Sequence, residues 1–66
     1  MEVNAKDEED FWLFAPTNEL TRKWFAACGA YSLTITDDGF FSIDASEVDD
    51  IIASFERIGG KVNIRL

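Results

Sequence analysis

Hydrophobic residues recur along this chain in two spacings, one typical of strands and one typical of helices. Phe11 to Phe14 is a continuous apolar run, which is typical of a strand covered on both faces. Tyr31 to Thr36 and Lys61 to Leu66 instead alternate apolar with polar residues, as half-buried strands do. Together with a short segment over Phe40 to Asp44, the pattern predicts strands at 11–14, 31–36, 40–44 and 61–66.

Two segments between these strands carry apolar residues at helical spacing. The first helix is expected to begin after an N-cap at Thr17 or Asn18, to run to about Cys28 and to stop at Gly29. Its apolar arc comprises Leu20, Trp24, Phe25, Ala27 and Cys28. The second helix is expected to open with a capping box from Ser46 to Asp49 and to end at Gly59-Gly60. Its apolar stripe comprises Val48, Ile51, Ile52, Phe55 and Ile58.

The register of the hairpin at 31–44 can be predicted, because residues opposite each other in a hairpin point to the same face. A two-residue loop would pair Ile35 with Ser42 and so mix the two faces. A three-residue loop over 37–39 pairs Ile35 with Phe41 and keeps apolar side chains together. The sequence therefore predicts the three-residue loop, with Gly39 in the left-handed conformation.

The expected order of strand, helix, strand, strand, helix, strand predicts an α+β fold. We expect a two-layer βαββαβ ferredoxin-like sandwich, with a four-stranded antiparallel sheet and both helices on one face. Residues 1–10 are polar and end in four consecutive acids, so they are predicted to be a flexible acidic arm before a single domain at 11–66. The uncovered face of the sheet is expected to carry Phe40 and either Trp12 or Phe14.

The charge of the chain narrows the kinds of partner it can bind. Its 66 residues include 13 acids, 6 bases and no histidine, which gives a formal net charge of −7. This charge should repel nucleic acid and anionic membranes, and it favours a basic protein surface. The single cysteine cannot form an intramolecular disulfide, and no segment resembles a signal peptide or reaches the roughly 20 apolar residues of a membrane span. We therefore expect a cytoplasmic protein.

Residues that could support catalysis or bind a metal are scarce. Without histidine, neither a Ser/His nor a Cys/His nucleophile pair can be assembled, and Cys28 is expected in the core. Asp37, Asp38, Asp44 and Glu47 lack the ligand spacing of a calcium loop, and Gly59-Gly60 lacks that of a phosphate-binding loop. We expect no enzymatic activity, no metal and no cofactor.

The acidic residues are concentrated in two segments. The first spans the hairpin tip and the start of the second helix, and it contributes Asp37, Asp38, Asp44, Glu47, Asp49 and Asp50. The second contributes Asp7, Glu8, Glu9 and Asp10. Such acids can simply stabilise helix N-termini and keep a small protein in solution. They can also imitate the phosphates that DNA-binding proteins grip with Lys and Arg, and we predict the first segment as the main contact and the second as auxiliary.

In its size, acidity, compact α+β build and lack of catalytic residues, the chain resembles the small phage-encoded anti-CRISPR proteins that act as DNA mimics. The resemblance implies a stoichiometric inhibitor that blocks target DNA binding by a CRISPR effector in the bacterial host. The alternative is a small regulatory or structural interaction module, monomeric or homodimeric, that uses the uncovered sheet face around Phe40. Direct nucleic-acid binding through that face is not expected, because the RNP motif is missing and the net charge is negative.

Overall fold

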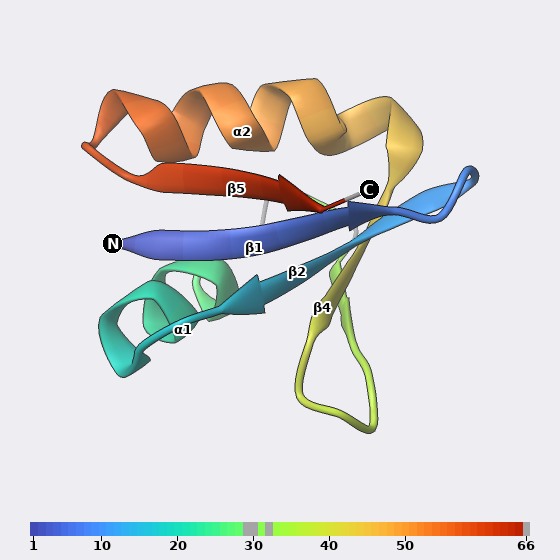
Figure 1. The fold of residues 1–66 in the computed structure, drawn as a ribbon, viewed down its shortest axis with the longest axis horizontal. Coiled ribbons are helices and arrows are strands. Elements are labelled where there is room, and N and C mark those ends of the chain that lie inside the picture. The colour runs from blue at the N-terminus through green and yellow to red at the C-terminus, as the bar shows by residue number, and fades with distance from the viewer. Residues whose placement is uncertain (29–30, 32, 66) are drawn as a thin grey trace.

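The computed structural model describes residues 1–28, 31 and 33–65, which form a five-stranded sheet with two helices packed on one face (Figure 1). The strands are β1 (Glu2–Asp7), β2 (Phe11–Pro16), β3 (Leu33–Ile35), β4 (Phe41–Asp44) and β5 (Lys61–Arg65). The helices are α1 (Glu19–Ala26) and α2 (Val48–Arg57), and a 3-10 turn over Ala45–Glu47 leads into α2. The strand order is β3-β4-β2-β1-β5, with β1 and β5 parallel and the other neighbours antiparallel.

The predicted α+β class is confirmed, but the ferredoxin-like arrangement is wrong. That arrangement has four antiparallel strands, whereas this sheet has five strands and is mixed. The additional strand is β1, whose residues the sequence assigned to a flexible arm and which in fact lies between β2 and β5. Val3 and Ala5 are fully buried on its helix-covered face, while Asn4 and Lys6 alternate onto the other face.

A turn over residues 8–10 connects β1 to β2 without a glycine. Glu9 adopts a positive φ of 73°, which is uncommon for a residue with a side chain. Asp7 Oδ1 accepts a hydrogen bond from Glu9 N at 2.8 Å, and this contact stabilises the turn. The turn residues are therefore fixed between two central strands.

The predicted hairpin is confirmed in register and loop length. Ile35 pairs with Phe41, and Thr34 and Leu33 follow in the same register. Gly39 has a φ of +81°, and Thr36 N donates to Phe40 O at 2.8 Å. The interior position expected for the first apolar run is also confirmed, because β2 lies between β4 and β1.

Both predicted helices are present, with changes at their ends. Asn18 is the N-cap of α1, and its Oδ1 accepts a hydrogen bond from Thr21 N at 2.9 Å. The predicted capping box at Ser46 is wrong: Asp44 caps the 3-10 turn by accepting from Ser46 N at 3.0 Å, and α2 begins only at Val48. This extra turn connects the end of β4 to the first turn of α2. The stop expected at Gly29 lies outside the described residues.

Aromatic rings fill the core between the sheet and the helices. The ring of Phe25 in α1 lies 5.5 Å from that of Phe14, 5.6 Å from Phe41 and 5.4 Å from Phe55, measured between centroids. All four side chains are buried, so Phe25 joins both helices to the sheet.

The predicted apolar arc of α1 is only partly confirmed. Phe25 is buried, but Leu20 is 65% exposed and the buried position beside it belongs to Thr21. Glu2 N donates to Thr21 Oγ1 at 3.1 Å, and this hydroxyl donates to Asn18 Oδ1 at 2.8 Å. A polar residue can occupy the core here because both functions of its hydroxyl are satisfied.

Candidate functional site

The structure divides the ten predicted contact acids between two ends of the molecule. One group comes from the turn after β1, the end of β4 and the start of α2, which Figure 1 shows at the same end of the molecule. Phe11 pairs with Asp44, and Ala45 N donates to Asp10 O at 3.1 Å, so these segments are adjacent. We call this group the acidic end; its members are Asp7, Glu8, Glu9, Asp10, Asp44, Glu47, Asp49 and Asp50.

Asp37 and Asp38 are not part of the acidic end. They lie in the loop between β3 and β4, at the far end of β4 (Figure 1). Extended chain separates Asp38 from Asp44 by roughly 15–20 Å at about 3.3 Å per residue. Arg22 of α1 reaches this loop, where its Nη1 donates to Gly39 O at 2.7 Å. The segment 37–50, predicted as one contact, is therefore split, and the auxiliary segment 7–10 joins the larger group.

Members of the acidic end, among them Asp7, Glu8 and Asp44, have partners within the chain. Asp44 accepts hydrogen bonds from the hydroxyl and the backbone N of Ser46, and both contacts lower the pKa of its carboxyl. Asp7 stabilises the turn through Glu9 N, and Glu8 forms an ion pair with Lys6 at 3.2 Å.

The exposed carboxylates of the acidic end have no cationic neighbour in the described chain. Within residues 1–28, 31 and 33–65, no Lys or Arg nitrogen lies within 4.0 Å of a carboxylate oxygen of Glu9, Asp10, Asp49 or Asp50. Asp49 and Asp50 occupy the first turn of α2, where the helix dipole also stabilises negative charge. A basic partner could contact these four carboxylates without first breaking an ion pair.

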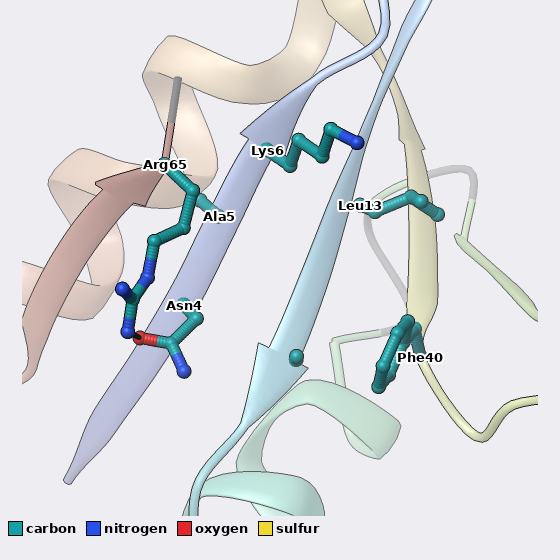
Figure 2. Close-up of a pocket in the computed structure, with 7 residues that line it drawn as sticks. Asn4, Ala5, Lys6, Leu13, Phe40 and Arg65 are labelled. Carbon is teal, nitrogen blue, oxygen red and sulfur yellow. Dashed lines mark hydrogen bonds between the residues drawn. The ribbon is translucent and has the colours of Figure 1, made fainter.

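A shallow cavity of about 150 Å³ lies on the sheet face opposite the helices (Figure 2). Ala15 leaves the hollow because its side chain is small, and Leu13 and Phe40 rise on one side of it. Asn4, Lys6 and Arg65 stand on the other side, and Arg65 Nη2 donates to Asn4 Oδ1 at 3.3 Å. We call this side of the sheet the open face.

The open face carries Phe40, as predicted, but neither Trp12 nor Phe14. Phe14 is buried against Phe25, and the Trp12 ring lies on the same side, 6.4 Å from that of Phe14. The open-face residues of β2 are instead Phe11, Leu13 and Ala15. A continuous apolar run does not show which of its residues points to which face of the sheet. Phe14 points to the helix-covered face because it pairs with Phe41 and Ala5, which are buried there.

Cys28 is the one cysteine of the chain, and its surroundings do not activate its thiol. Cys28 is half-buried, its Sγ donates to Trp24 O at 3.3 Å, and burial raises the pKa of its thiol, which disfavours the reactive thiolate. Across the described ranges, no group of three or more Asp, Glu or Cys side chains could hold a metal ion. In the same residues, neither helix is long and apolar enough to cross a membrane.

Comparisons with protein-family models, with curated proteins and with solved structures give no match to this chain. The acidic end and the open face are therefore the two features from which a function can be inferred. The acidic end could have been found in the sequence only by recognising β1, because that strand brings residues 7–10 beside Asp44.

Proposed function

We propose that this protein is a stoichiometric inhibitor that presents its acidic end to the basic, phosphate-binding surface of a nucleic-acid-binding protein. The observation that carries the proposal is the convergence of carboxylates from three segments. Among them, Glu9, Asp10, Asp49 and Asp50 have no cation within ion-pair distance in the described chain. Proteins that bind duplex DNA match its dense phosphate charge with Lys and Arg. The resemblance to anti-CRISPR proteins makes the DNA-binding surface of a CRISPR effector the first partner to test.

Charge and rigidity both support this use of the acidic end. Its eight carboxylates, taken with Lys6 and the neighbouring Arg65, leave a local charge of −6. The carboxylates are attached to a hydrogen-bonded turn, a capped 3-10 turn and the first turn of α2, so little chain entropy is lost when they bind. Long-range attraction to a basic groove should mainly raise the association rate.

A competition assay with two matched variants tests the proposal. Labelled duplex DNA is bound to purified CRISPR effector–guide complexes, and the concentration of this protein that displaces half of the DNA is measured. The double change Asp49→Asn with Asp50→Asn removes two charges from the acidic end, whereas Asp37→Asn with Asp38→Asn removes two from the distant loop. Because an exposed charge pair contributes about 0.2–1 kcal/mol, the first variant should lose roughly 2- to 30-fold in potency.

The distant-loop variant should inhibit nearly as well as the wild type, and raising the salt concentration should weaken both. Equal losses in the two variants would mean that total charge matters and the acidic end does not. No displacement of DNA from any effector, or from a panel of DNA-binding repressors used in the same assay, would refute the proposed inhibition.

A further inference from the structure

The open face has the composition of a protein interface. Its centre is apolar and consists of Phe11, Leu13 and Ala15 from β2 together with Phe40, and Phe11 is 38% exposed. Polar and charged residues surround this centre on the flanking strands. Interfaces between proteins share this plan of an apolar centre within a polar rim.

Charge is divided across the open face. Arg65 and Lys61 lie on the edge strand β5, and Lys6, which is paired with Glu8, lies beside Arg65 on β1. We call this side of β2 the cationic half. Glu2 lies on the same half and accepts a hydrogen bond from Asn63 Nδ2. On the other side of β2, Asp44 ends β4, and Asp37 and Asp38 lie in the loop before it. A uniformly charged partner would match only one of these halves.

We infer that the occupant of the open face is a second copy of this chain, packed face to face about a two-fold axis parallel to β2. Rotation about this axis places the β1 side of one copy opposite the β4 side of the other copy. The cationic half of one copy then lies over the acidic half of the other, and the same contact occurs twice, as in isologous dimers. The open face is thus complementary to itself.

The cavity on the open face fits the same arrangement. Asn4 flanks Ala15 on the β1 side, and Phe40 flanks it on the β4 side, next to the Phe14–Phe41 pair. Rotation about β2 therefore carries Phe40 of the second copy over Asn4, into the hollow beside Ala15. That hollow has a volume of about 150 Å³, the size of an apolar cavity that accepts a benzene ring. The ring of Phe40 and the hollow are matched in size.

The area of the face is also sufficient. The molecule measures 26 × 25 × 24 Å and exposes 4239 Å², so one of six similar faces has roughly 700 Å², near the ~800 Å² per partner of a standard interface. A chain this short buries only about 60% of its unfolded surface by itself, and covering a second sheet face would add to its stability.

Sedimentation velocity analysis tests the dimer directly, without any other partner. At about 150 mM salt, where the net repulsion is screened beyond roughly 8 Å, the wild type should become dimeric as its concentration rises toward the millimolar range. Leu13→Asp and Phe40→Asp should each weaken the dimer at least about 30-fold, as expected for the centre of an interface. Leu20→Asp introduces the same charge at a site on α1 that is 65% exposed, and it should leave dimerisation unchanged.

Charge exchange tests the orientation of the two copies. Lys61→Glu with Arg65→Glu in one chain, and Asp37→Lys with Asp38→Lys in another, should each weaken self-association. An equimolar mixture should form heterodimers more readily than either variant forms homodimers. Circular dichroism establishes that every variant is folded before its mass is interpreted.

Three results would overturn the inference. They are a wild type that stays monomeric at millimolar concentration, a Leu20→Asp variant as impaired as Leu13→Asp, and a charge-exchanged mixture that does not associate. A monomeric wild type whose Phe40→Asp variant no longer displaces DNA would assign the open face to the inhibited protein instead.

Discussion

Replacing Thr21 with Val tests the junction between α1 and β1. Thr21 is fully buried, its Oγ1 accepts a hydrogen bond from Glu2 N at 3.1 Å, and it donates one to Asn18 Oδ1 at 2.8 Å. Valine has nearly the same shape but no hydroxyl. The substitution therefore retains the packing, removes both hydrogen bonds and leaves the Glu2 N–H at the start of β1 without this acceptor.

The expected loss of stability follows from these two contacts. A hydrogen bond contributes about 0.5–1.5 kcal/mol, and a buried donor left without a partner costs about 1–3 kcal/mol. Thr21→Val should therefore lower the free energy of unfolding by about 2–3 kcal/mol, which in a domain of this size lowers Tm by roughly 10–20 °C. Urea unfolding followed by tryptophan fluorescence measures the difference, because Trp12 and Trp24 both pack against the core.

The matched control is Thr21→Ser, which keeps the hydroxyl and loses one methyl group. It should cost about 1 kcal/mol, the value of one buried methyl group. A Thr21→Val variant that is as stable as Thr21→Ser, or more stable, would refute the claim that this hydroxyl anchors β1 to the helix.

Two further substitutions test the turn that follows α2 and the cap of the 3-10 turn that precedes α2. A Cβ at Gly60 would lie 2.5 Å from Phe55 Cδ2 and Cε2, which is too close for an unstrained contact. Gly60→Ala should therefore lower the free energy of unfolding by about 1–3 kcal/mol. In a Phe55→Leu background, most of this loss should disappear because the ring is gone. If the cost is unchanged in that background, the contact with the ring is not its cause. The hydrogen bonds from Ser46 lower the pKa of Asp44 in the folded state below its ordinary value of 3.8. The ionised Asp44 carboxylate therefore stabilises the fold above pH 3.8, and this stabilisation is lost as the pH falls through the lower folded pKa. Asp44→Ser keeps a capping oxygen that does not titrate, so its urea midpoint should fall less than that of the wild type between about pH 5 and 2; parallel profiles would contradict this role.

The hairpin of β3 and β4 could be predicted because its constraints are local. Apolar residues had to face apolar ones across the pair, and Gly39 supplied the positive φ that a three-residue loop needs. The helix positions were predicted for the same reason, since Asn18 and the apolar stripe around Phe55 lie within the segments they define.

β1 could not be predicted with the same ease, because its evidence is weak locally and strong only at long range. Val3 and Ala5 are its only buried apolar residues, and they are small. The turn that follows uses Glu9 at positive φ, where Gly or Asn would have marked a hairpin. Its parallel partner begins at Lys61, which pairs with Glu2 from the far end of the chain. The alternation of Val3 and Ala5 with polar residues was the one available signal.

The grouping of the acidic residues could not be predicted for a related reason, because residues that are close in sequence need not be close in space. Asp38 and Asp44 are near neighbours along the chain, yet an extended strand holds them apart, whereas Asp10 reaches Asp44 through the sheet. Acids at the ends of strands are grouped by strand pairing. The composition of the acidic surface therefore depended on recognising β1.

The position of β1 also changes what the acidic residues can do. In a flexible arm, Asp7 to Asp10 would sample many arrangements, and ordering them on a partner would cost roughly 1–2 kcal/mol per residue. Held between β1 and β2, they form a fixed array beside Asp44, while Lys6 and Arg65 point to the open face. An unfolded chain has the same net charge of −7 but no acidic end. The proposed inhibition should therefore require the fold, and variants such as Thr21→Val should lose it at the temperature at which they unfold.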